Sequence, residues 1–206
     1  MALSVGKYTS APGFFTGAAA IVASNYFLIQ FRGEIDVVVA SIYFTLVCAT
    51  DTLKNKIPNI LNAGLILAGV CFNGWQNGLS GVFTSVTGLV LGIGLLLLFY
   101  LMGGVGAGDV KALGAVGALV GPTDLLHIFV YMGFFGGGLA ILHYLFYSDV
   151  KSKLKQAWVS VQASVLTRDP AAIRLSHKSE KTSLRFPYAT AIAFGYYAFL
   201  VWGEVI

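Results

Sequence analysis

The chain has 206 residues, of which 57% are hydrophobic and 11% charged, and its formal net charge is +4. A mean hydropathy of +0.79 excludes an ordinary soluble globular domain and indicates an integral membrane protein. The positive balance does not indicate a nucleic-acid partner, because the basic residues lie between the apolar segments. We therefore predict an all-α, polytopic membrane helix bundle that has lipid as a partner and binds no nucleic acid.

Seven apolar segments follow one another along the chain, and a membrane-spanning helix needs about 20 such residues. They are residues 13–31, 35–50, 59–73, 81–102, 110–121, 124–147 and 186–203. The fifth is short and ends at the turn signal "GPTD", so we expect a half-length helix whose end is buried in protein or lines a wet cavity. The sequence thus predicts six to seven transmembrane segments.

The basic residues predict the orientation of these segments, because Lys and Arg gather in cytoplasmic loops. Eight of the thirteen basic residues lie between Asp149 and Arg185, which assigns this stretch to the cytoplasm. Counting back through seven crossings puts the N-terminus, Lys54 and Lys111 on the same side. Within the basic stretch, residues 151–166 have the spacing of an amphipathic helix at the interface, either a surface anchor or a guide for substrate.

Two acidic residues stand at the predicted cytoplasmic ends of helices. Asp51 closes the run 35–50, and Asp109 opens the short fifth segment. Carboxylates beside membrane segments are costly and suggest function, although each could be an independent cap or loop residue. Two carboxyl groups in one poorly hydrated site share a proton, so one can activate water while the other polarises a peptide carbonyl. This chemistry needs no metal or other cofactor, and the sequence does not say which residue is the acid.

Glycines surround the second aspartate in "GGVGAGDVKALG", residues 103–114. We expect Gly106 and Gly108 to allow backbone angles and close approaches that other residues do not, so that a substrate could lie against the backbone. Alternatively, they only let two helices pack closely. Asp109 would then start a helix, where the dipole favours negative charge.

Three stretches, in order, resemble the type IV prepilin peptidases, which are G-x-G-D intramembrane aspartyl proteases. They are "DTLKNKIPN" at 51–59, "GAGD" at 106–109 and "RFPYATAIAFG" at 185–195, and the likeness covers residue 35 to the end. The resemblance implies that Asp51 and Asp109 are the catalytic dyad of an aspartic-type endopeptidase in the bacterial inner membrane. It also implies that the substrates are prepilins or pilin-like precursors, cut after a short basic leader at the cytoplasmic face.

The chain also departs from parts of that family. Bifunctional members carry paired Cys-x-x-Cys motifs and N-methylate the new terminus, whereas Cys48 and Cys71 stand alone in apolar segments and are expected to be small buried residues. We therefore expect cleavage without methylation, as in the short tight-adherence (Flp) pilus branch. The signal-peptide-peptidase group expects Tyr before the first Asp, where this chain has Thr50. Residues 1–34 would be an extra segment beside a peptidase domain 35–206, which includes the basic loop 148–184.

Three residues near the dyad are candidates for supporting roles. Lys111 could steady the charge of the dyad or contact the substrate backbone, or it could be a topology anchor. Pro58 is predicted to lie in the first turn of the third segment's helix. Asn59 could hydrogen-bond near the dyad or cap that helix.

Other functions remain open at this level. A transporter or channel could use the two aspartates as a proton or ion relay, and an inactive scaffold of a pilus or secretion machine is a further alternative. His127, His143 and His177 have no metal-ligand spacing, so no metal site is expected. A homo-oligomer is compatible with the sequence.

Overall fold

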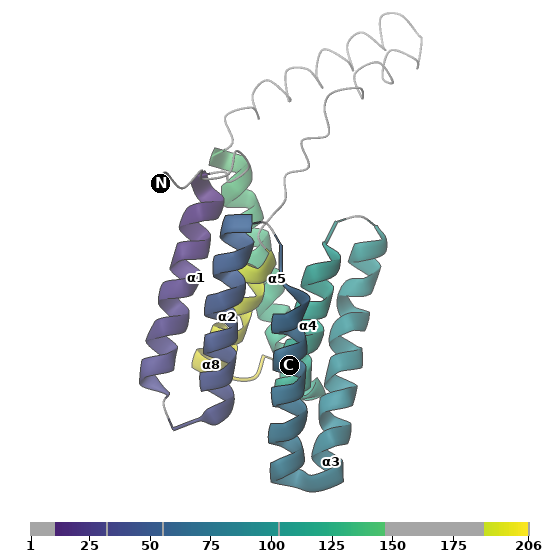
Figure 1. The fold of residues 1–206 in the computed structure, drawn as a ribbon. Helices are drawn as coiled ribbons and strands as arrows, with labels where there is room; N and C mark the ends of the chain where they lie inside the picture. The colour runs from purple at the N-terminus through teal and green to yellow at the C-terminus, as the bar shows by residue number, and fades with distance from the viewer. Residues whose placement is uncertain (1–10, 32, 55, 103, 147–187, 206) are drawn as a thin grey trace, which may run out of the picture. The chain divides into compact units, whose positions relative to one another are not determined.

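The computed structural model describes residues 11–31, 33–54, 56–102, 104–146 and 188–205 (Figure 1). Across these ranges the chain forms helices and no strand, which confirms the all-α prediction. The helices are α1 (Ala11–Gln30), α2 (Ile35–Lys54), α3 (Asn59–Leu101), α4 (Ala107–Val120), α5 (Pro122–Phe146) and α8 (Tyr188–Trp202).

The chain divides into two compact units, residues 1–139 with 187–206 and residues 140–186. The first unit holds all the described helices except the end of α5. The predicted amphipathic helix 151–166 and the basic loop 148–184 lie outside the described residues, as does the start of the stretch 185–195.

Helix α3 is a hairpin of two helical arms that meet at Gly78. This glycine has φ 59° and ψ −139°, in the region that favours glycine. Across the two arms, the Asn73 amide donates to Ser85 Oγ over 3.0 Å, and Ser85 Oγ donates to the Gly69 carbonyl over 3.2 Å. The arms are therefore antiparallel, and the separate predicted segments 59–73 and 81–102 are confirmed.

Helix α4 is buried by the α3 hairpin along most of its length. Its 14 residues span roughly 21 Å, less than a hydrocarbon core of roughly 30 Å, so the predicted half-length helix is confirmed. A Cβ atom at Gly88 would overlap the Gly117 carbonyl, and one at Gly69 would lie 2.5 Å from the Ala118 carbonyl oxygen. The backbones thus touch directly, as small residues permit in membrane bundles.

The far end of α4 is held by a side chain from the hairpin. Carbonyl groups in the last turn of a helix have no partner within that helix. The Asn73 amide donates to the carbonyl oxygens of Ala118 and Leu119, at 3.3 and 3.0 Å. Gly121, with φ 86°, then turns the chain directly into α5 at Pro122.

Helices α1, α2 and α8 pack against one another through side chains. The Phe27 ring of α1 stacks on the Tyr197 ring of α8, with centroids 4.5 Å apart. The Tyr197 hydroxyl donates to Ser41 Oγ of α2 over 3.2 Å, which joins the three helices. Phe44 of α2 is 1% exposed and packs against Tyr196.

Helices α5 and α8 pack together and hold the C-terminal residues. His127 stacks on Phe199, and its Nδ1 accepts a hydrogen bond from the Val205 backbone over 3.2 Å. The Tyr131 hydroxyl donates to the Gly203 carbonyl over 3.3 Å. His127 therefore has a structural role at this end of α5.

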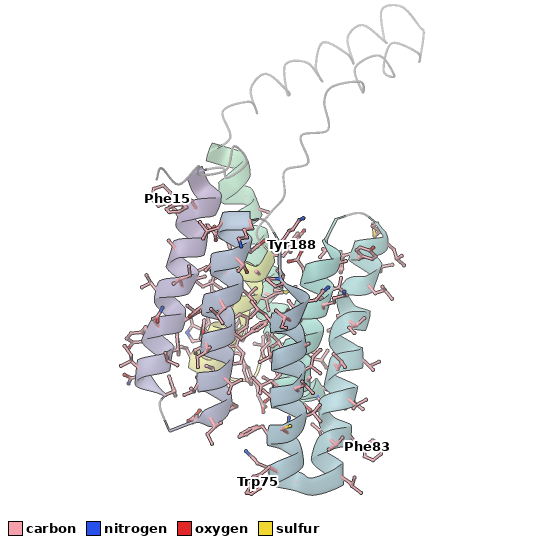
Figure 2. All side chains as sticks on the ribbon, in the orientation of Figure 1. Phe15, Trp75, Phe83 and Tyr188 are labelled. Carbon is pink, nitrogen blue, oxygen red and sulfur yellow. The ribbon has the colours of Figure 1, made fainter. Side chains whose placement is uncertain are left out.

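Large apolar side chains point outward from the helices. Phe15, Phe83 and Trp75 extend away from the ribbon, and Trp75 is 91% exposed (Figure 2). Helices α2, α3 and α5 are long and apolar enough to cross a membrane. Together these features describe a helical membrane protein, because such a surface suits lipid rather than water.

The two cysteines differ in their surroundings. Cys48 is completely buried in α2, as expected, but Cys71 lies exposed on α3. The expectation of two buried cysteines is therefore wrong for Cys71, because its helix face points outward rather than toward α4. Hydropathy alone could not distinguish these faces, since both sides of α3 are apolar.

Candidate active site

Several helix ends meet at one end of the first unit, which we call the aspartate end and define by residues 51–59 and 102–111. Helix α2 ends here and α3 begins, and the second arm of α3 ends here before α4 begins (Figure 1). The Lys111 ammonium donates to Asn59 Oδ1 over 3.2 Å. A Cβ atom at Gly108 would lie 3.4 Å from Ile57 Cβ. The chain after α2 and the start of α4 are therefore neighbours.

Asp51 lies within the last turn of α2. The helix continues to Lys54, so the predicted end of this segment at residue 50 was four residues too early. The Asp51 side chain is half-buried, and its Oδ2 atom is shielded from solvent. It interacts electrostatically with Cys48, one turn earlier on the same helix. The carboxylate is thus carried by a regular helix and faces partly into the protein.

Asp109 lies in the first turn of α4, which begins two residues earlier, at Ala107, and has Gly106 as its N-cap. The Gly106 N–H donates to Asp109 Oδ2 over 3.2 Å, and the Asp109 N–H donates to the Gly106 carbonyl over 3.1 Å. A carboxylate at this position is stabilised by the positive end of the helix dipole. The expectation that Asp109 sits at a helix start is confirmed, and the side chain folds back onto that start.

The glycines of "GAGD" matter because they have no side chain, and not because their backbone angles are unusual. Gly106 has φ −81° and ψ 150°, which any residue can adopt, so the expected special angles are wrong for this position. A Cβ atom there would lie 3.0 Å from Asp109 Oδ2, whereas one at Gly108 would make an ordinary contact with Ile57. Positive φ angles among the described glycines occur at Gly78, Gly121 and Gly203.

The three supporting candidates also lie at the aspartate end. Pro58 is the N-cap of α3, with φ −64° and ψ 130°, and the helix begins only at Asn59. Pro58 therefore precedes the first turn instead of lying in it, because its extended ψ angle is not helical. Asn59 does not cap the helix; its side-chain oxygen accepts the hydrogen bond from Lys111. The two residues tie the start of α3 to α4 beside Asp109.

Sequence reasoning missed two tyrosines near Asp109. Tyr43 of α2 and Tyr188, the first residue of α8, both interact electrostatically with the Asp109 carboxylate. The Tyr43 hydroxyl also donates to Asn62 Oδ1 over 2.8 Å, and both side chains are buried. Tyr43 lies eight residues before Asp51, about 80° away around the helix, so their spacing in the sequence gave no signal that both belong near the site. Tyr43 shows that the face of α2 approaching α4 is near Asp109.

These features define a helical membrane protein that presents two half-buried carboxyl groups, from α2 and α4, at one end of its bundle. The chain belongs to the Type IV leader peptidase family, whose sequence model matches residues 38–142. The match includes Asp51 and Asp109 and leaves α1 and α8 outside. No curated protein and no solved structure matches the chain. The predicted family is thereby confirmed, and the chain is assigned to a family of membrane peptidases.

Proposed function

We propose that this protein is an intramembrane aspartic endopeptidase that removes the short basic leader of prepilins or pilin-like precursors, with Asp51 and Asp109 as its catalytic dyad. The chain belongs to the leader peptidase family, and one structural observation supports the proposal most directly. The last turn of α2 and the first turn of α4 each bring a half-buried carboxyl group to the aspartate end. Paired carboxyl groups in such surroundings can divide acid and base roles between them.

The two helix ends favour different charge states for the two carboxyl groups. Asp109 lies at the positive end of the α4 dipole and accepts a hydrogen bond from the Gly106 backbone. Asp51 lies at the opposite, negative end of α2. Each helix end contributes about 0.3–1 kcal/mol to such a preference. Negative charge is thus better stabilised on Asp109 than on Asp51.

This asymmetry supports an assignment of the chemical roles that the sequence left open. Asp109, as carboxylate, takes a proton from the water that attacks the peptide carbonyl carbon. Asp51, as carboxylic acid, donates a hydrogen bond to the carbonyl oxygen and polarises it. When the C–N bond breaks, a proton from the dyad goes to the departing amine nitrogen. Hydrolysis then needs only water and the two side chains, and forms no covalent intermediate.

Charges at the two ends of the unit support cleavage at the cytoplasmic face of the bacterial inner membrane. The aspartate end carries Lys54 and Lys111, whereas Asp36, at the start of α2, and Asp124, at the start of α5, lie at the other end. Basic residues favour the cytoplasmic side. The absence of any Cys-x-x-Cys pair from the sequence supports peptidase activity without N-methylation, as in the tight-adherence branch.

The test is leader removal by the full chain in liposomes. A panel of synthetic pilin-like precursors, each with a basic leader before an apolar helix, is incubated with each variant, a methyl donor is supplied, and products are read by mass spectrometry. Asp51→Asn and Asp109→Asn are expected to lower the cleavage rate at least about 100-fold, and new termini should be unmethylated. Asp36→Asn and Asp124→Asn are matched controls, because these two acids lie at the end of the unit opposite the aspartate end. Both variants should cleave the precursors normally.

Two results would contradict the proposal. Wild-type cleavage by either dyad variant would show that the substituted carboxyl group is not catalytic. Proton movement across the liposome membrane, with every precursor left intact by the wild-type protein, would favour the relay transporter instead.

A further inference from the structure

Helix α1 covers the turn of α2 that carries Asp51. This helix precedes the residues matched by the family, yet it packs along α2 within the first unit (Figure 1). Its buried positions recur at helical spacing and are Gly17, Ala20, Ser24 and Phe27. The first of these positions lies against the last turn of α2, beside the proposed acid.

At that position a side chain of α2 packs directly on the backbone of α1. A Cβ atom at Gly17 would overlap Thr52 Oγ1 and would lie 3.1 Å from Thr52 Cβ and 3.2 Å from Cγ2. Thr52 is 7% exposed, and among the described residues no group pairs with its buried hydroxyl. The two residues therefore fit by shape rather than by a hydrogen bond. Gly17 lies within a regular helix, so its backbone angles do not require glycine. The position requires glycine because a side chain there would occupy the space that Thr52 fills.

The last turn of α2 needs such external support. The final four carbonyl groups of a helix have no partners within it, and helix ends fray. Asp51 and Thr52 are adjacent in this turn, which ends at Lys54. A shift of Thr52 therefore moves Asp51, and a displacement of about 1 Å at a catalytic group can lower a rate about 100-fold.

We propose that Gly17 and Thr52 are positioning residues for Asp51, so that α1 contributes to catalysis by the peptidase. The Gly17 backbone sets how closely Thr52 can approach α1, and Thr52 in turn sets the orientation of the last turn of α2. This inference rests on the proposed function, because it takes Asp51 to be the catalytic acid. It assigns a role to a helix that lies outside the family match.

The experiment introduces the overlap and then removes it. Gly17→Ala in the full chain is expected to lower kcat about 10-fold for a cleaved pilin-like precursor, while KM changes less than about 2-fold. Adding Thr52→Ala removes the atom that a new Cβ would overlap, so the double variant should recover kcat to within about 3-fold of wild type. Thr52→Val keeps the shape, loses only the unpaired hydroxyl, and should retain full activity.

Controls distinguish positioning from a general loss of structure. Gly33→Ala is the matched glycine control, because a Cβ atom there meets nothing within 4 Å, and it should leave kcat unchanged. Thermal unfolding in detergent reports whether each variant folds. A wild-type kcat for Gly17→Ala, or a double variant that stays as impaired as the single one in kcat or in folding, would overturn the inference. Activity of Asp51→Asn would instead overturn the proposed function, which separates the two failures.

Discussion

The helices that carry the two aspartates are held in different ways. Helix α4, with Asp109, is short and buried, and it touches the α3 hairpin backbone to backbone at Gly69, Gly88 and Gly92. Helix α2, with Asp51, is longer and contacts α1 and α8 through side chains such as Thr52 and Ser41. Asp109 stands at a helix start that its own hydrogen bonds reinforce, whereas Asp51 stands in a final turn that relies on neighbours.

The two kinds of contact predict which substitutions the site tolerates. Backbone contacts cannot rearrange around an added atom, because neither partner has a rotamer to adjust. Side-chain contacts can give way by a few tenths of an ångström and then shift the groups beside them. We therefore expect substitutions around α4 to affect folding first, and substitutions around α2 and the helix starts to affect catalysis or local stability.

The largest effect is expected from Gly88→Ala, which would place a methyl group into the Gly117 carbonyl. The free energy of unfolding should fall by at least about 2–3 kcal/mol, measured by denaturation in detergent micelles. Gly94→Ala on the same arm is the control, since a Cβ atom there meets nothing within 4 Å. Equal stability of the two variants would show that the contact between α3 and α4 is not tight.

A smaller loss of stability is expected from Tyr43→Phe on the α2 side. This change removes the hydroxyl that donates to Asn62 Oδ1 in a buried position. Leaving a buried acceptor unpaired costs about 1–3 kcal/mol, so the unfolding free energy should fall by that amount. Adding Asn62→Leu should recover part of it, and a single variant as stable as wild type would argue against this buried bond.

Gly106→Ala should affect the rate more than the stability. The new methyl carbon would lie 3.0 Å from Asp109 Oδ2 and would push the carboxylate from its place at the helix start. We expect kcat to fall about 5- to 10-fold, with less than about 1 kcal/mol lost in stability. Gly104→Ala is the control in the same loop, since its Cβ atom would only touch the Phe99 carbonyl oxygen at 3.5 Å. Identical kcat values for the two variants would remove the role assigned to Gly106.

The smallest effect is expected from Asn59→Ala, which removes the acceptor of the Lys111 hydrogen bond. Both side chains are exposed, so the variant should lose no more than about 0.5–1 kcal/mol of stability and less than about 3-fold in rate. Lys111→Met should give a similar result, and the double variant should add little to either change. A loss of activity near that of Asp109→Asn would mean that the pair contacts the substrate.

Much of the arrangement could be predicted from the sequence because hydropathy and turn residues act locally. The apolar runs located every described helix, "GPTD" marked the end of α4, and the aspartate motifs predicted the family. The helix limits around Asp51 and Pro58 were missed, because polar residues can extend a helix that tertiary packing supports.

Contacts between distant parts of the chain could not be predicted in the same way. The Tyr43–Asn62 bond and the Gly17–Thr52 contact join residues on different helices, and nothing local to either sequence position specifies them. The same holds for the glycines. Gly88 and Gly94 are alike in sequence context, yet only the first faces another backbone. Which glycine is required depends on which side of the helix meets a neighbour.

Because α4 is anchored at its far end, the length of the helix determines the depth in the membrane at which Asp109 lies. Asn73 and the turn at Gly121 hold one end of the helix in the hairpin, and Asp109 stands near the other, roughly 18 Å away along the axis. Inserting or deleting four residues, about one turn, would move the carboxyl group by roughly 6 Å along the axis and rotate it by roughly 40°. Under the proposed function, the number of residues in α4 therefore sets the level in the membrane at which Asp109 meets a peptide bond.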